Sequence, residues 1–166
     1  MHVPADLPSP GTERLRLMLG VRLGLLTLAG QLRQSWAAHA AAAGLSTAQV
    51  NALLTLEPGT AVPMRSLAAR LNVDASNLSV LIDRLERRGA VERRPDPADR
   101  RVKALALTGE GERLRAAFWR GVVEDPGTLD PLADADLQAL AGLLDVLGVT
   151  ESVASSSGTP VRDWAT

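Results

Sequence analysis

The chain has 166 residues and a mass of 17.5 kDa, the size of one domain with a sizeable core. Apolar residues make up 46% and charged residues 22%, which is typical of a folded globular protein and excludes a disordered one. The formal net charge of −1 excludes a uniformly basic surface. Since there is no cysteine, disulfides, thiolate zinc sites and cysteine nucleophiles are excluded as well.

The start of the chain lacks the features of a signal peptide, because Met1–Gly11 is rich in proline and has neither a basic start nor an apolar run. The most hydrophobic stretch, Leu23–Leu32, has ten residues between Arg22 and Arg33, which is too short to span a bilayer. We therefore expect a cytoplasmic protein without a membrane partner.

Charge is unevenly distributed along the chain. The segment 84–103 holds eight basic residues against four acidic ones, whereas 124–166 holds eight acidic residues and one basic residue. Seventeen of the 18 basic residues are arginine, so their clustering is more informative than their number. The near-neutral total thus conceals a basic segment followed by an acidic end.

The first third of the chain predicts two helices. A long helix is expected from Glu13 to about Ala43, since apolar residues recur on one of its faces, at Val21, Leu25, Leu28 and Leu32. A helix of about thirty residues is long for a monomeric domain and often packs against a partner chain. Ser46 and Gln49 have the spacing of a capping box, which predicts a second helix up to about Glu57.

A helix-turn-helix pattern follows. Pro63 suits the first turn of a third helix, and Asn72-Val73 forms a short turn after it. Asp74 is a good N-cap for a fourth helix, which Gly89 ends. The apolar face of this fourth helix consists of Leu78, Leu81, Ile82 and Leu85.

The rest of the chain predicts a hairpin and two more helices. Ala90–Arg94 and Arg101–Leu107 read as strands joined by the polar loop Pro95–Arg100, and apolar residues alternate in the second strand. Thr108 is a candidate cap for a fifth helix. A sixth helix follows Pro131, with an apolar face of Leu137, Leu140, Ala141, Leu144 and Leu147.

Several motifs lie in order between Met64 and Gly111. They are Leu67-Ala68-Ala69-Arg70-Leu71, Leu81-Ile82-Asp83-Arg84-Leu85-Glu86-Arg87-Arg88-Gly89, Val91-Glu92-Arg93, Asp96-Pro97-Ala98-Asp99-Arg100-Arg101 and Leu107-Thr108-Gly109-Glu110-Gly111. In these motifs the segment resembles the MarR family of bacterial winged-helix transcription regulators. The arrangement Asp-Arg-Arg followed by Leu-Thr-x-x-Gly is more specific than a bare helix-turn-helix pattern.

The resemblance covers residues 13–147 and implies a mainly α fold. It implies a winged helix-turn-helix DNA-binding lobe over 46–108, with a three-helix core and a β-hairpin wing. Long N- and C-terminal helices, over 13–43 and 109–147, would form a homodimer. We expect residues 1–12 to be a flexible N-terminus and 148–166 a flexible, acidic and serine-rich tail.

The fourth helix is the candidate recognition helix. A step of 100° per residue places Ser76, Val80 and Arg87 opposite the apolar face, flanked by Asn77, Ser79, Asp83 and Arg84. Short polar side chains and arginine on one face suit a major groove, and Val80 suits a thymine methyl group. The family often carries arginine or another polar residue at the Val80 position. The alternative is a solvated face, with Asp83 and Arg84 paired to neighbouring residues.

The hairpin is the candidate wing. Asp99 and Arg101 lie two residues apart and therefore on one side of an extended segment. The resemblance implies that Arg101 enters the minor groove while Asp99 orients it. Phosphate contacts are expected from Arg93, Arg94, Arg100 and Lys103. The alternative is a surface salt bridge, worth about 0–1 kcal/mol.

The family implies a small-molecule effector between the dimerisation helices and the DNA-binding lobe. Trp36 and His39, three residues apart, are candidates to line that pocket, and an aromatic or phenolic effector is one possibility. The alternative is a core tryptophan with a solvated or capped histidine. Phe118 and Trp119 carry the same ambiguity, since each large ring in this aromatic-poor chain is first a packing anchor.

Enzymatic chemistry is not expected. The sequence shows no carboxylate pair, metal-ligand spacing or phosphate loop, so neither a metal nor another cofactor is predicted. The leading hypothesis is a homodimeric repressor that binds a pseudo-palindromic operator in double-stranded DNA and is released by a ligand. The alternatives are a winged-helix protein-interaction module, including one for membrane-associated partners, and a non-specific architectural DNA-binding protein.

Overall fold

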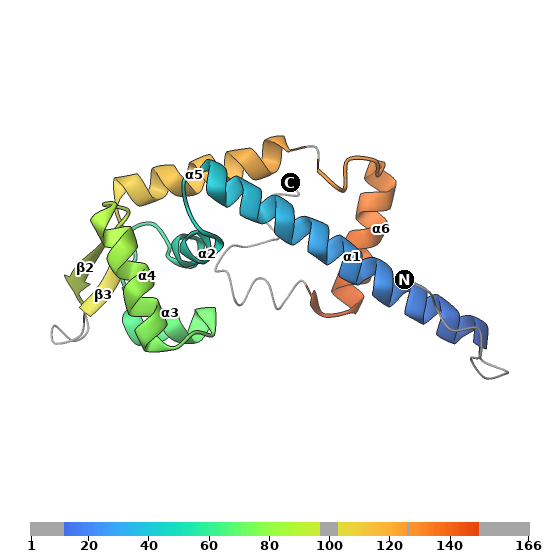
Figure 1. The fold of residues 1–166 in the computed structure, drawn as a ribbon, viewed down its shortest axis with the longest axis horizontal. Coiled ribbons are helices and arrows are strands. Elements are labelled where there is room, and N and C mark those ends of the chain that lie inside the picture. Colours follow the sequence, from blue (N-terminus) through green and yellow to red (C-terminus); the bar gives the residue numbers. More distant parts are fainter. Residues whose placement is uncertain (1–11, 97–102, 126, 150–166) are drawn as a thin grey trace.

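The computed structural model describes residues 12–96, 103–125 and 127–149, and in this part of the chain helices predominate (Figure 1). Of the predicted tails at 1–12 and 148–166, residues 1–11 and 150–166 lie outside the described residues, as does the wing tip at 97–102, whereas Thr12 is the first residue of α1. The elements are α1 (Thr12–Ala42), α2 (Thr47–Thr55), β1 (Val62–Pro63), α3 (Met64–Leu71), α4 (Ala75–Arg87), β2 (Val91–Pro95), β3 (Lys103–Leu107), α5 (Gly109–Glu124) and α6 (Asp134–Val146).

The core forms where α2, α3, α4 and α5 meet the small sheet. The largest of its fully buried side chains include Leu53, Leu67, Leu78, Ile82, Leu85 and Phe118. Leu78, Ile82 and Leu85 are three of the four residues predicted for the apolar face of α4, and the fourth, Leu81, is half-buried. Burial of this stripe fixes the opposite face of α4 toward solvent.

The sheet has three antiparallel strands in the order β1-β3-β2, in which β2 and β3 form the predicted hairpin. Val91 pairs with Leu107 at the open end of the hairpin, and Pro95 pairs with Lys103 at the end where the loop connects the strands. The short β1 was not predicted from the sequence, and its Val62 pairs with Leu105. β3 lies between the two other strands, and its whole run 104–107 is buried, alanines and leucines alike.

The predicted helix caps are partly confirmed. Ser46 accepts a hydrogen bond from the Gln49 amide while the Gln49 side chain accepts one from the Ser46 amide, which is a complete capping box. Asp74 occupies the N-cap position of α4 without a side-chain cap hydrogen bond. Pro63 is the N-cap residue of α3, one position before the first turn in which it was predicted.

The Leu-Thr-x-x-Gly motif has a physical explanation at the start of α5. The Thr108 hydroxyl accepts a hydrogen bond from the Gly111 amide and so caps the helix. A Cβ atom on Gly111 would lie 2.1 Å from the Ala90 carbonyl oxygen, a distance that no side chain can occupy. Gly111 therefore allows α5 to begin directly against Ala90, the residue before β2.

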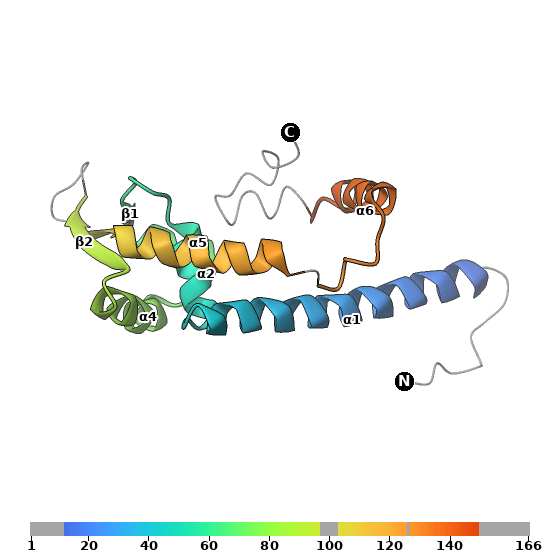
Figure 2. The same ribbon diagram turned by 90° about the horizontal axis from the view of Figure 1, so that it is seen from above.

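Most of α1 extends beyond the lobe formed by α2, α3, α4 and the sheet (Figures 1 and 2). By length and composition, its stretch Glu13–Ala42 is long and apolar enough to cross a membrane. The prediction that the apolar stretch Leu23–Leu32 is too short to span a bilayer was wrong about the length of the helix. The helix continues through Arg22 and Arg33 on either side of that stretch. The core helix of a soluble protein passes the same test, so this property describes an apolar surface and does not identify what covers it.

The helix α6 stands apart from α1 and α5 (Figure 2). None of its described side chains is buried. Leu143, Val146 and Leu147 are 62%, 84% and 66% exposed. Apolar surface of this kind, together with the exposed part of α1, is unusual for a monomer.

Candidate nucleic-acid interface

The exposed face of α4 carries the side chains predicted to read bases. Ser76, Asn77 and Val80 are exposed, and Ser79 is half-buried. Arg84 and Arg87 are exposed further along the helix. The helix lies at the end of the molecule opposite the extended half of α1, with the strands β2 and β3 beside it (Figure 1). A polar helix face next to a projecting hairpin is a geometry that fits adjacent grooves of a duplex.

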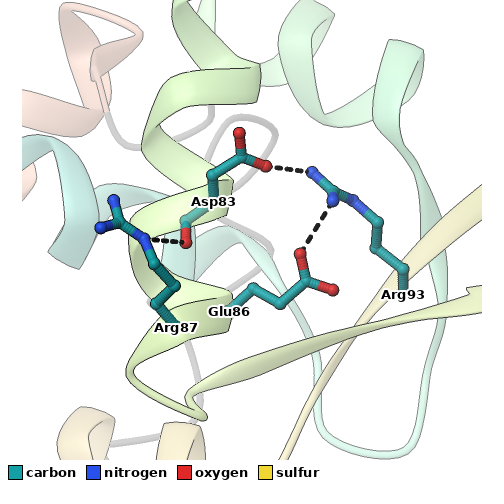
Figure 3. Close-up of polar contacts among 4 residues, drawn as sticks. All are labelled: Asp83, Glu86, Arg87 and Arg93. Carbon is teal, nitrogen blue, oxygen red and sulfur yellow. Dashed lines mark hydrogen bonds and ion pairs between the residues drawn. The ribbon is translucent and has the colours of Figure 1, made fainter.

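Arg93, predicted to contact phosphate, forms two ion pairs within the protein. Its guanidinium projects from β2 toward α4, where Nη2 lies 2.6 Å from Asp83 Oδ1 and Nη1 lies 2.8 Å from Glu86 Oε2 (Figure 3). Asp83 therefore pairs with a neighbouring residue, which agrees with the alternative that this face of α4 is solvated. Two charge-assisted bonds hold Arg93 between the wing and the recognition helix, which leaves its charge compensated by protein rather than available to phosphate.

Arg87 takes no part in the ion pairs that Arg93 makes with Asp83 and Glu86. Its Nε donates to the Asp83 backbone carbonyl over 3.2 Å, while its terminal nitrogens point away from Arg93 (Figure 3). This contact restricts the arginine stem without neutralising its charge. Arg87 thus remains a candidate for a contact with DNA.

The remaining wing residues divide into two groups. Arg94 forms an ion pair with Glu92 and is 59% exposed, and Lys103 is exposed where β3 begins. Asp99, Arg100 and Arg101 lie outside the described residues, so the expected minor-groove contact stays a prediction. The described part of the wing accordingly offers Arg94 and Lys103 as candidate phosphate contacts.

The turn between α3 and α4 is hollowed on its surface. The hollow is lined by Ala68, Ala69, Asn72, Val73, Asp74 and Asn77. Asn72 ends α3 in the left-handed conformation, with a φ of 51°. Asparagine tolerates this conformation better than most residues, so the tight turn predicted at Asn72-Val73 forms without a glycine.

The aromatic residues proposed for an effector pocket pack on one another. The ring centroid of Trp36 lies 4.7 Å from that of Phe118 and 5.8 Å from that of Trp119, in edge-to-face geometry. The Trp36 indole N–H donates to Asn51 Oδ1 over 3.3 Å. These contacts favour the alternative reading of Trp36 as a packing anchor between α1 and α5.

His39 belongs to a polar cluster beside these rings. Its Nε2 lies 2.8 Å from Asp125 Oδ2, which also accepts a hydrogen bond from the Ser35 hydroxyl over 2.8 Å. Because a carboxylate only accepts, His39 must carry its proton on Nε2. The His39 and Ser35 hydrogen bonds, with a further one from the Gly127 amide, lower the pKa of Asp125 below its usual value. The cluster thus ties α1 to the end of α5.

Sequence reasoning missed two arginines that cap helices from a distance. Arg88, at the end of α4, donates to the carbonyls of Ala43 and Gly44 at the end of α1. Arg115 in α5 donates to the Leu56 carbonyl at the end of α2. Burial lowers the pKa of the Arg115 guanidinium, and nearby acidic residues oppose that shift. No local signal reveals such contacts, because the partners lie 44, 45 and 59 positions apart.

Comparison with known proteins finds similarity to transcription regulators. The sequence model of the MarR family matches residues 45–103. The chain is 29% identical over 97 residues to the HTH-type transcriptional repressor MdtR of Bacillus subtilis. That match covers 58% of this chain and 63% of MdtR, so it spans less than two thirds of the relative's own length.

Solved structures share most of this fold. The apo form of wild-type MarR from E. coli superposes with a TM-score of 0.67 at 22% identity, covering 86% of this chain and 98% of that protein. CouR from Rhodococcus jostii RHA1, solved with p-coumaroyl-CoA bound, gives a TM-score of 0.57 at 27% identity, covering 84% and 95%. The fold of this chain is therefore that of the MarR winged-helix proteins over most of its length.

Proposed function

Because this chain belongs to the MarR family of winged-helix transcription regulators, we propose that it acts as a homodimeric repressor that binds a pseudo-palindromic operator. The observation that carries this proposal is the exposed polar face of α4 beside the wing. Its side chains lie opposite the buried stripe of Leu78, Ile82 and Leu85 and are free to enter a major groove.

Dimerisation is supported by apolar surface at the end of the molecule away from α4. On α1, Leu17 and Leu26 are 68% and 67% exposed. On α6, none of the described side chains is buried. A second copy that covers these two helices would remove this surface from water and place two α4 helices on one side of a duplex. We infer a cytoplasmic protein on the same grounds, with α1 covered by protein rather than by lipid.

Base reading is assigned to Ser76, Asn77 and Val80, which are exposed in the first half of α4. Ser79, Arg84 and Arg87 flank them. Two such helices related by a dimer axis meet successive major grooves, so half-sites should be inverted and about 10 bp apart. Replacement of Asn77 by alanine should change the preference among operator variants rather than weaken all of them equally.

The proposal includes release of the repressor from its operator by a small effector. The neighbour CouR binds p-coumaroyl-CoA, an aromatic thioester. In this chain, Trp36 and His39 lie where α1 meets α5, beside Phe118, Trp119 and Asp125. A ligand that separated these contacts would change how α1 sits on the DNA-binding lobe and thereby alter operator affinity.

Footprinting on the DNA upstream of the protein's own gene tests the proposal. We expect a protected region with inverted symmetry, high affinity against competitor DNA, and release by aromatic acids. Protection without symmetry would contradict the two-helix docking, and affinity that competitor DNA abolishes would indicate an architectural protein. Absence of binding to any DNA would favour a protein-interaction module.

A further inference from the structure

Arg88 connects the recognition helix with the long first helix. It is the C-cap residue of α4, directly after Arg87. Its guanidinium crosses to the end of α1, where Nη2 donates to the Ala43 carbonyl over 3.0 Å and Nη1 donates to the Gly44 carbonyl. The Arg88 side chain thus bridges the carboxyl ends of the two helices.

Electrostatics favours a cation at this place. The carboxyl end of a helix carries a partial negative charge, and here the ends of both α1 and α4 are near the same guanidinium. The two carbonyls that it binds lie beyond the last residue of α1, where helix carbonyls lack intrahelical partners. The planar fork of arginine can serve both carbonyls at once, which a lysine ammonium does less well.

The turn after α1 is shaped to admit this side chain. Gly44 has a φ of +68°, and its amide donates to the Ala41 carbonyl while the Leu45 amide donates to the Ala40 carbonyl. A Cβ atom on Gly44 would lie 3.2 Å from Arg88 Nη2. Glycine therefore provides both the left-handed turn and the space for the guanidinium.

The position of this contact gives it a specific consequence. In the described part of the chain, α1 packs mainly on α2 and α5, whereas α4 packs on α2, α3 and β2. The Arg88 fork is a direct polar link between the helix assigned to dimerisation and the helix assigned to DNA reading. A rotation of α4 relative to α1 that exceeds the reach of the Arg88 side chain breaks these hydrogen bonds.

We propose that Arg88 is a positioning residue that holds α4 at a defined angle to α1 and thereby determines which half-site spacing the dimer recognises. This inference rests on the proposed function, because spacing has meaning only for a dimer on DNA. The alternative role for an arginine at the end of a recognition helix is a phosphate contact, which would add affinity at every spacing alike.

The experiment measures Kd for a set of operators whose half-sites are set closer or farther apart than the preferred spacing by one and two base pairs. The proteins are the wild type, Arg88→Met, Arg88→Lys and the control Arg120→Met, which removes an exposed arginine of α5. Circular dichroism and light scattering confirm that each variant is folded and dimeric.

We expect wild type and Arg120→Met to discriminate equally between spacings. Arg88→Met should reduce the ratio of Kd values between unfavourable and preferred spacings by about fivefold or more, and Arg88→Lys should fall between them. If Arg88→Met does not fold, Arg88→Lys alone still tests the loss of the guanidinium that donates to two carbonyls at once.

Two results would overturn the proposal for Arg88. One is an unchanged ratio of Kd values in the folded variants. The other is an equal loss of affinity at all spacings with a salt slope lower by about one, which would identify a phosphate contact. Failure of the proposed function is seen separately, since the wild type itself would then bind no inverted repeat.

Discussion

Arg93 of β2 lies 2.6 Å from Asp83 of α4, and this ion pair binds the base of the wing to the recognition helix. Glu86, one turn further along α4, adds a second carboxylate at 2.8 Å. Because Arg93 is held by both, its charge is already compensated before DNA arrives. We therefore expect that breaking this ion pair lowers the stability of the fold and leaves the affinity for DNA unchanged.

A double-mutant cycle on Arg93→Met and Asp83→Asn should show a coupling of about 0.5–1 kcal/mol in the free energy of unfolding, since both side chains are partly exposed. Arg93→Met should leave the salt slope of DNA binding nearly unchanged. The matched variant Arg94→Ala should flatten that slope by about one, because Arg94 is 59% exposed on the same strand. A flattened slope for Arg93→Met would show that the arginine leaves its carboxylates to bind phosphate.

Arg101→Ala should weaken operator binding by about 1–3 kcal/mol and leave the melting temperature nearly unchanged, because the family resemblance assigns this residue to the minor groove. Fluorescence anisotropy and thermal melting measure the two effects. Equal affinity for the variant and the parent would mean that the hairpin does not reach the groove.

Light scattering at micromolar concentration should give about twice the chain mass of 17.5 kDa. Leu143→Glu should shift the protein toward the monomer, because this leucine is 62% exposed on α6 and its burial in a dimer would desolvate the new charge. Ala48→Glu, on the exposed side of α2, is the matched control and should leave the mass unchanged. A wild-type monomer, or recovery of the chain with membranes, would contradict dimerisation through α1 and α6.

The stability of the fold should depend on Asp125 at acidic pH. Hydrogen bonds from His39, then Ser35 and Gly127, hold the pKa of Asp125 in the folded state below its usual value of 3.8. A lowered folded-state pKa means that the stabilisation is complete above the unfolded-state value and is lost as the pH falls through the folded-state value. Urea denaturation at several pH values from about 5 downward should therefore show a loss of stability below about pH 4.

Asp125→Asn should remove this part of the acid dependence, while Asp145→Asn, an exposed carboxylate of α6, should retain it. The contrary result is a free energy of unfolding that falls equally for the parent and for Asp125→Asn below the usual aspartate pKa. That result would show that the hydrogen bonds of Asp125 with His39 and Ser35 do not stabilise the fold.

Local chemistry made much of this structure predictable. The capping box at Ser46 and the cap at Thr108 form as expected, because their hydrogen bonds join residues three positions apart. The apolar period on α4 indicated which face is buried, and so which side chains remain available to DNA. The short β1 escaped prediction, since two residues carry no period and pair only because β3 is present beside them.

The sequence by itself determined the order of the six helices and the hairpin, the buried stripe of α4 and the family motifs, because each depends on residues that are neighbours in the chain. Only the tertiary structure decided the partners of the arginines. Arg93 meets Asp83 and Arg88 meets Ala43 after distant segments have packed, 10 and 45 positions apart. A long, flexible cation can reach phosphate, carboxylate or a helix end with equal ease, and the packed backbone alone determines which of these lies within its reach.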